Sequence, residues 1–150
     1  MIINYEDLVA NYREVIEYAV NFSEKFSVIT TMKKPYSKIP FNSEHDEVMR
    51  AFEPYMLEYV AGIRKWPGTE TKAKHKAMVI YKSCNATRRA LKDLPNFFLP
   101  IENDLPEDIT FYRNGKAWII TVSHEDLAIL SDCTSEDRTF LQKKGIRFCD

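Results

Sequence analysis

The chain has 150 residues, which is close to the usual size of one domain and enough to bury a sizeable core. Hydrophobic residues make up 45% of it and charged residues 29%, a balance that excludes disorder along the whole chain. No apolar run approaches the roughly 18–20 residues of a membrane-spanning helix. The N-terminal segment has neither the basic start nor the apolar core of a signal peptide. We therefore expect a globular protein without a membrane span.

Cysteine usage and charge distribution narrow this expectation. The three cysteines, Cys84, Cys133 and Cys149, are widely spaced and odd in number, which argues against a disulfide framework and favours the cytoplasm. The net charge of −1 hides two blocks of opposite sign. Residues 64–92 carry nine Lys or Arg and one acid, whereas residues 102–137 carry nine Asp or Glu and two basic residues. Either block suits a partner of opposite charge, unless the two pack side by side and cancel.

Two amphipathic helices are predicted in the first half of the chain. Residues 4–26 place apolar side chains at helical spacing, with Asn4 as the N-cap. A strand over 27–31 follows, because β-branched residues succeed one another there. A second helix is predicted over 43–65, with a kink or a meeting of two helices near Glu53, since Pro54 removes a backbone hydrogen bond.

The second half is predicted to be mostly β-structure. The Asn114-Gly115 pair supplies the two positive φ angles of a type I′ turn, so residues 107–122 are expected to form a β-hairpin. Thr134 and Asp137 are expected to cap a last short helix that stops at Gly145. The other predicted segments are a polar basic linker over 69–76, a strand over 77–81, a helix over 86–94 capped by Asn85, a loop over 95–106 and an edge strand over 146–148. Residues 127–130 are expected to form either a third strand beside the hairpin or the tail of its second strand.

The order of these elements predicts an α+β fold. We expect a small, mostly antiparallel sheet that contains the 107–122 hairpin and packs against three to four helices. Residues 1–150 are expected to form a single globular domain. Because the basic segment over 67–76 is the one candidate boundary, the alternative is a helical N-terminal lobe over residues 1–66.

The densest group of reactive side chains is the tetrapeptide Ser123-His124-Glu125-Asp126, which follows the hairpin. On an extended chain, alternate residues point the same way, so His124 and Asp126 would share a face. An Asp that orients an imidazole makes a general base, and both residue types also bind metals. The alternative is a strand end in which Ser and Asp cap a turn. Since no nucleophile or paired metal motif accompanies the group, catalysis and metal binding are not the leading interpretation.

A second candidate site is the strand-to-helix turn over 80–89. Free amides at a helix N-terminus favour an anion, and Arg88 and Arg89 lie in the first turn of the predicted helix. Cys84 at that terminus is a candidate for a lowered thiol pKa. The segment contains no glycine that would let its backbone cradle a phosphate. The alternative is an ordinary turn followed by a solvated basic helix face.

Two further features indicate contacts with macromolecules. Phe97 and Phe98 lie in a proline-bounded loop next to the acidic residues Glu102 and Asp104, and such residues anchor protein interfaces. The alternative is that this loop folds back and caps the core. The basic stretch over 64–92 interleaves aromatic residues in the manner of a nucleic-acid site, but the near-neutral net charge argues against that partner.

The leading interpretation is a non-catalytic cytosolic protein-binding module, such as an inhibitor, an immunity-type protein or a phage or mobile-element accessory protein. It is based on the Tyr- and Phe-rich composition, the separated charge and the lack of a complete catalytic motif. Another protein is the expected partner, and no cofactor is expected. The alternative is a small enzyme or binder for a phosphorylated or nucleotide ligand. In that case Arg88 and Arg89 would hold the phosphate, and His124 and Asp126 would be the acid–base pair.

Overall fold

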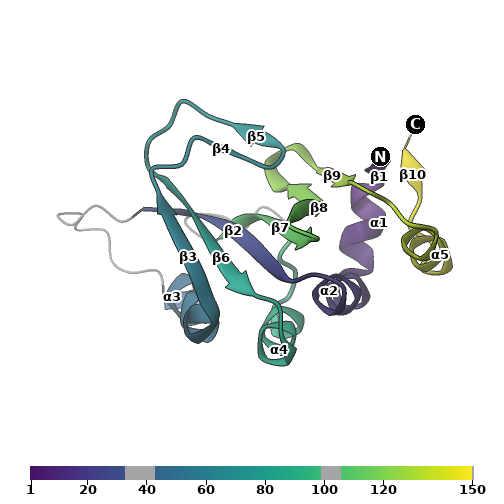
Figure 1. Cartoon of the computed structure of the whole chain (residues 1–150), viewed down its shortest axis with the longest axis horizontal. Coiled ribbons are helices and arrows are strands. Elements are labelled where there is room, and N and C mark those ends of the chain that lie inside the picture. The colour runs from purple at the N-terminus through teal and green to yellow at the C-terminus, as the bar shows by residue number, and fades with distance from the viewer. Residues whose placement is uncertain (33–42, 99–105, 150) are drawn as a thin grey trace.

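An antiparallel sheet with helices packed against it makes up the computed structural model, which describes residues 1–32, 43–98 and 106–149 (Figure 1). The strands of this sheet are β1 (Ile2–Ile3), β2 (Lys25–Thr31), β3 (Met56–Ala61), β6 (Lys76–Lys82), β7 (Glu107–Arg113), β8 (Lys116–Val122), β9 (Leu127–Leu130) and β10 (Phe148–Cys149). Their order across the sheet is β10-β1-β9-β8-β7-β2-β6-β3. The α+β prediction is confirmed, although the sheet, with eight strands in the described residues, is larger than expected.

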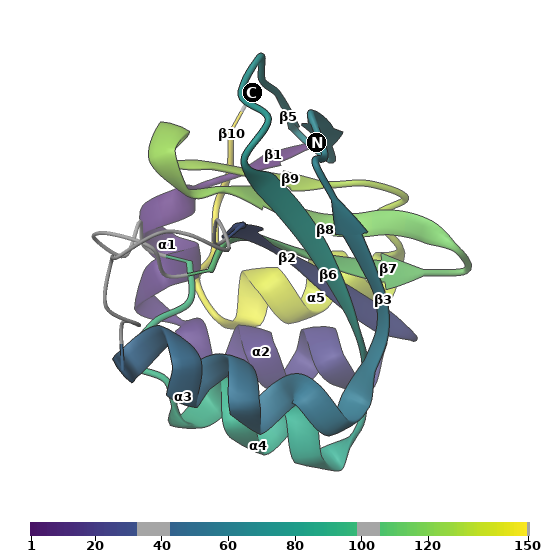
Figure 2. The ribbon, with the colours of Figure 1, turned by 90° about the vertical axis from the view of Figure 1, so that its left-hand side faces the viewer.

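The helices lie on one side of this sheet, and a short β-hairpin arm projects from the other (Figure 2). The described α-helices are α1 (Tyr5–Ala10), α2 (Tyr12–Asn21), α3 (Ser43–Phe52), α4 (Asn85–Asp93) and α5 (Ser135–Lys143), with 3-10 turns η1 (Glu53–Tyr55) and η2 (Ser123–Glu125). The arm consists of β4 (Lys65–Trp66) and β5 (Thr69–Glu70). The core fills the space between the helices and the sheet. Within the described residues, no helix is long and apolar enough to cross a membrane.

The predicted hairpin over 107–122 is present. Asn114 and Gly115 have φ angles of +52° and +73°, as a type I′ turn requires. The register between β7 and β8 shifts by one residue in the middle of the hairpin, which makes a bulge in β8. Trp118 and Ile119 are consecutive in β8, yet both belong to the core. The bulge therefore lets one strand place two large side chains in the core.

Helix α5 begins and ends as predicted. The Thr134 hydroxyl accepts a hydrogen bond from the Asp137 amide at 3.2 Å, which completes the expected N-terminal cap. Gly145 has a φ of +72°, and the Ile146 amide donates to the Leu141 carbonyl at 2.9 Å. The left-handed glycine thus turns the chain out of the helix, as in a Schellman ending.

The segment predicted as one helix over 4–26 is two helices and the start of a strand. Asn4 caps α1 as predicted, and its side chain accepts from the Asp7 amide at 2.9 Å. At Asn11 the backbone (φ −108°, ψ 28°) leaves the helical region, so α1 ends and α2 begins there. The strand begins at Lys25, two residues earlier than predicted, because β2 pairs with both β6 and β7 from that residue on.

The helix predicted over 43–65 is wrong beyond Phe52. Pro54 lies in η1. The six residues after η1 form β3, the edge strand that pairs with β6. Proline interrupts the helical hydrogen bonds, and the β-branched and aromatic residues after it gain cross-strand partners instead. A strand pairing between distant segments therefore outweighs the helical spacing of the local sequence.

Two predictions on chain organisation are also wrong. Residues 1–66 contribute β1, β2 and β3 to the sheet, so they do not form a separate helical lobe. The segment 69–76 is not a linker, since it begins with β5 of the arm and ends with the first residue of β6. Helix α4 follows the predicted strand, but its N-cap is Cys84 rather than Asn85.

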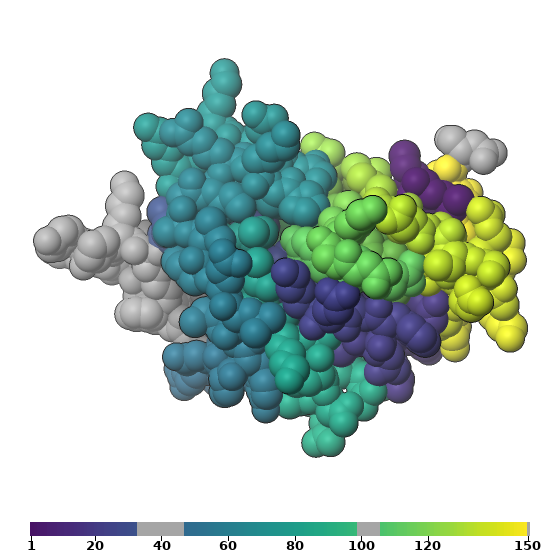
Figure 3. Space-filling view, in the orientation of Figure 1, coloured from purple at the N-terminus to yellow at the C-terminus, as the bar shows by residue number. Residues whose placement is uncertain are grey.

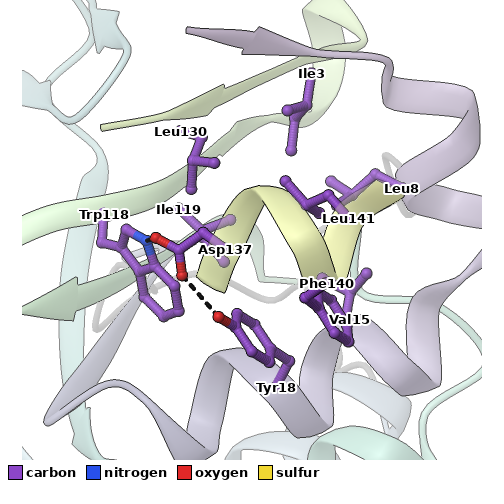
Figure 4. A pocket seen from close by; sticks show the side chains of 10 residues that line it. All are labelled: Ile3, Leu8, Val15, Tyr18, Trp118, Ile119, Leu130, Asp137, Phe140 and Leu141. Atoms are coloured by element: carbon purple, nitrogen blue, oxygen red, sulfur yellow. Dashed lines mark hydrogen bonds between the residues drawn. The ribbon is translucent and has the colours of Figure 1, made fainter. Parts of the chain in front are cut away.

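Asp137 is a buried carboxylate that joins α5 to the hairpin and to α2 (Figure 4). It accepts hydrogen bonds from the Arg113 guanidinium at 3.0 and 2.8 Å. The Tyr18 hydroxyl donates to it at 2.7 Å, and the Trp118 indole at 3.3 Å. Burial acts to raise the pKa of Asp137, but Arg113 and the Thr134 amide outweigh it, and the pKa falls to about 2. The carboxylate is therefore stabilised in its charged form.

The Asp137→Asn variant should lower the free energy of unfolding by about 2–4 kcal/mol, because it leaves the Arg113 guanidinium without its counter-ion. The folded pKa of Asp137, about 2, is below its ordinary 3.8. Its stabilising contribution is therefore complete above about pH 4 and is lost as the pH falls toward about 2. Urea unfolding at neutral pH and at about pH 3 should show a smaller acid-induced loss in the variant than in the wild type. The same pH dependence in both would contradict this account.

Candidate functional site

A buried carboxylate at the start of β7 is the centre of the first candidate site. Asp108 is 1% exposed and has a φ of +50°, which is uncommon for a residue other than glycine. The Trp66 indole donates a hydrogen bond to its Oδ2 at 2.9 Å, and the Ser123 amide donates to its Oδ1 at 2.8 Å. One side chain therefore connects β7 with the arm and with η2.

The turn of the arm explains how Trp66 reaches Asp108. Gly68 has a φ of +84°, and a Cβ atom there would lie 2.6 Å from Cγ2 of Val122 and 3.3 Å from Cγ2 of Ile120. Only glycine tolerates both the left-handed backbone and this close approach to β8. The arm can therefore lie directly on the sheet, where the Trp66 side chain is buried.

Glu107 and His124 converge on the buried Asp108. One side-chain nitrogen or oxygen from each of these three residues lies within 4.8 Å of the others. His124 is 51% exposed and Glu107 is 26% exposed, so the cluster opens to solvent. The Lys76 ammonium forms an ion pair with one oxygen of Glu107 at 2.9 Å. The cluster therefore combines an imidazole with two carboxylates, one of them buried.

The electrostatics of Asp108 differ from those of Asp137. Burial raises the pKa of the Asp108 carboxyl, and the neighbouring Glu107 charge adds to this effect. The hydrogen bonds from Trp66 and Ser123 and the charge of His124 lower the pKa, but the net shift is upward. A carboxyl of this kind can hold a proton or bind a cation more readily than an exposed one.

Two buried hydroxyls extend the polar character of this region. Among the described residues, neither the Tyr5 hydroxyl nor the Ser123 hydroxyl has a hydrogen-bond partner. Burial raises the pKa of Tyr5, whereas the nearby Ser123 hydroxyl opposes the shift without reaching hydrogen-bond geometry. The charges of Asp126 and Asp108 raise the pKa further. Polar groups thus continue from the cluster into the interior below η2.

The predicted pairing of His124 with Asp126 on one face of a strand is wrong. Residues 123–125 form the 3-10 turn η2, and Asp126 has a left-handed φ of +50°, so the alternation of an extended chain does not apply. His124 lies instead with Glu107 and Asp108. Asp126 borders a separate hollow with Tyr5. The His124 imidazole therefore lies near the carboxylates of Glu107 and Asp108, and its Nε2 is also 3.7 Å from the Glu125 carboxylate.

The predicted phosphate-binding residues, Arg88 and Arg89, lie in helix α4 close to Cys84. Arg88 donates to the Asn21 side chain at 2.6 Å, and Arg89 is exposed. Burial acts to raise the pKa of the Cys84 thiol, but hydrogen bonding with Thr87 outweighs it and the net shift is downward. Helix α4 lies at the opposite end of the molecule from the β8–β9 connection that carries His124 (Figures 1 and 2). The residues of the enzyme alternative therefore do not converge on one pocket.

The predicted interface at the 95–106 loop needs a correction. Phe97 and Phe98 are buried in the core, and Phe98 packs edge-on against Tyr12, with 5.1 Å between the ring centroids. The first residues of the loop therefore cap the core, which was the alternative to an interface. The rings of Phe97 and Phe98 are not exposed anchors for a partner. Glu102 and Asp104 lie outside the described residues.

The outer edge of β3 is the second candidate site, and Figure 3 shows this part of the surface (teal). Within the described residues, β3 is the last strand of the sheet and pairs with β6 alone. Its side chains Met56, Leu57 and Tyr59 are 48%, 58% and 51% exposed. On one side of the strand, Met56 and Tyr59 border an open hollow together with Met49 and Arg50 of α3. Large apolar side chains are thus concentrated on an open sheet edge.

Sequence reasoning found the Asp108 cluster only through His124 and missed the edge of β3. A helical spacing of apolar residues concealed β3, and the signal against that helix was Pro54. The partnership of Trp66 with Asp108 links residues 42 positions apart, so no local pattern contains it. The Trp66-Pro67-Gly68 sequence was a usable signal, because it is typical of a tight turn.

Comparison of the chain with family models, curated proteins and solved structures gave no match.

The Gly68→Ala variant should detach the arm from the sheet and lower the free energy of unfolding by more than about 2 kcal/mol. A left-handed alanine costs about 1 kcal/mol, and the contact with Val122 adds to that cost. Gly62→Ala is the matched control, because Gly62 has a similar φ of +67° and open space at its Cβ position. Urea unfolding measures the difference, and Trp66 fluorescence reports the arm. Equal losses in the two variants would contradict the close packing of the arm.

Proposed function

We propose that this protein is a non-catalytic binding module whose partner protein adds a strand to the open edge of β3. The supporting observation is the exposure of Met56, Leu57 and Tyr59 on one edge strand. Proteins protect sheet edges from pairing, and contiguous exposed apolar residues mark interaction surfaces. Addition of a strand gives main-chain hydrogen bonds, and pockets beside the strand select side chains.

The hollow beside β3 supplies such a pocket. Met49 and Met56 are flexible and polarisable, so they can adapt to the shape of an inserted apolar side chain. Arg50 and Glu53 contribute opposite charges to the lining. An apolar residue of the partner strand would therefore insert beside Tyr59, and polar groups would surround it.

Charge on the strand favours a different protein over a second copy of this chain. Glu58 is exposed near the middle of β3. In the antiparallel register that pairs Glu58 with Glu58 of a second copy, the two carboxylates would lie directly opposite each other, and like charges in such a pair are destabilising. A partner strand with a Lys or Arg opposite Glu58 would instead gain a favourable contact. We infer an extended, apolar partner segment that carries at least one basic residue.

The edge of β3 can be tested by site-specific photo-crosslinking in the cells that produce the protein. A photoreactive phenylalanine derivative at position 59 should give one dominant adduct with another protein, whereas the same group at Phe22 should not. Phe22 is the matched control, because it is 55% exposed and lies outside β3. The purified adduct partner should then bind the wild type in solution and protect β3 amides from hydrogen exchange.

The Leu57→Lys/Tyr59→Lys double variant should weaken that complex at least tenfold, because both side chains lose their apolar contact. Both positions are more than half exposed, so the free energy of unfolding should change by less than about 1 kcal/mol. Titration of the purified partner and urea unfolding measure the two effects. Adducts of equal intensity at both positions, or an adduct with a second copy of this chain, would overturn the proposal.

A further inference from the structure

Asp108 and Asp137, the two aspartates that are buried among the described residues, are compensated differently. Asp137 is paired with the Arg113 guanidinium. Asp108 is equally buried, yet its hydrogen-bond donors within the described residues are an indole and a backbone amide, both uncharged. Burial of a carboxylate without a neighbouring cation costs several kcal/mol, unless the carboxylate keeps its proton or binds a cation. The environment of Asp108 therefore favours an added positive charge.

The side chains around Asp108 are those of a metal site. An ion about 2.1 Å from each ligand atom needs those atoms to be roughly 3–4 Å apart. The ligand atoms of Glu107, Asp108 and His124 lie within 4.8 Å of one another. Small rotations of the half-buried Glu107 side chain and the exposed His124 side chain can close this difference, while the buried carboxylate stays in place.

The hydrogen bonds to Asp108 orient its carboxylate so that it can bind a metal ion. Each of its oxygens accepts one hydrogen bond, so each keeps a lone pair for an ion. Trp66 and Ser123 fix the orientation of the carboxylate in the way that outer donors orient metal ligands. The energetic cost of ordering this ligand is met on folding, before any ion arrives.

We propose that Glu107, Asp108 and His124 bind a divalent transition-metal ion of the zinc class. One imidazole nitrogen and two carboxylate oxygens favour such an ion over Mg²⁺ or Ca²⁺, which prefer oxygen alone. Three protein ligands leave at least one coordination position, and the exposure of His124 opens it to solvent. The bound ion would fasten β7 to η2 and, through Asp108 and Trp66, to the arm.

Lys76 makes the proposal testable in both directions. Its ammonium group contacts Glu107 at 2.9 Å, so it competes with a cation for that carboxylate. Removal of this charge should strengthen metal binding, whereas removal of a ligand should weaken it. Opposite effects of two neighbouring substitutions would not follow from general loss of structure.

The experiment is a titration of the full chain with Co²⁺ after treatment with a chelator, followed by visible absorption and calorimetry. The wild type should bind one ion, without the intense near-ultraviolet band of a cobalt–thiolate bond. His124→Ala and Glu107→Gln should each weaken binding at least tenfold, and Lys76→Met should strengthen it severalfold. His75→Ala is the matched control, because His75 is exposed and lies outside the cluster, and its binding should equal that of the wild type.

Thermal unfolding provides a second measurement that does not depend on absorption. Excess Co²⁺ should raise the melting temperature of the wild type and of His75→Ala, but not that of His124→Ala. Unchanged affinity in His124→Ala would overturn the proposal. A thiolate band that disappears on substitution of a cysteine would also overturn it, because it would place the ion at Cys84, Cys133 or Cys149 instead.

Discussion

The arrangement of sheet and helices depends on the hydrogen bonds and the ion pair that the Asp137 carboxylate forms. It binds the guanidinium of Arg113 in β7, the indole of Trp118 in β8 and the hydroxyl of Tyr18 in α2, while it also caps its own helix. Four segments, of which α2 is far from the other three in the sequence, therefore have one acceptor in common. Since that acceptor is charged and has a charged donor, its burial is compensated and the network is satisfied as a unit. These hydrogen bonds attach the hairpin to α5 and to α2.

Asp108 occupies the same hairpin at its other end and shows the opposite balance. The pKa of Asp137 is lowered because a guanidinium contacts it, whereas the pKa of Asp108 is raised because burial dominates over two neutral donors. For Asp108 the sign of the pH linkage is reversed: a raised folded pKa means that loss of its proton, as the pH rises, costs stability. A buried carboxylate without a charged partner is typical of positions kept for binding or chemistry. The imidazole of His124 and the carboxylate of Glu107 lie beside Asp108, so the proposed ion binding accounts for all three residues.

Sequence patterns of a few residues predicted those parts of the fold whose conformation depends on interactions between neighbouring residues. The Asn114-Gly115 turn, the Thr134 cap and the Gly145 ending each depend on a few consecutive residues, and each is present. Local rules did not predict β3, because its strand character comes from pairing with β6, about 20 residues later in the chain. The Asp108 cluster was found in part, through His124 alone, because Glu107 and Asp108 come from the start of β7 and the Trp66 donor to Asp108 comes from the arm. The sites missed are thus those that only the tertiary structure assembles.

The segment between β3 and β6 connects the two candidate sites. It leaves the open edge at Ala61, forms the arm that places Trp66 on Asp108, and returns as Lys76, which contacts Glu107. The Ile63 amide donates to the Lys76 carbonyl at 3.0 Å, so the two ends of the segment are bonded to each other beside the edge strand. A strand added to β3 would order one end of this segment, and an ion at Asp108 would order the middle of it. Because linkage is reciprocal, any effect of the ion on the affinity of the partner strand must be matched by an equal effect of that strand on the ion.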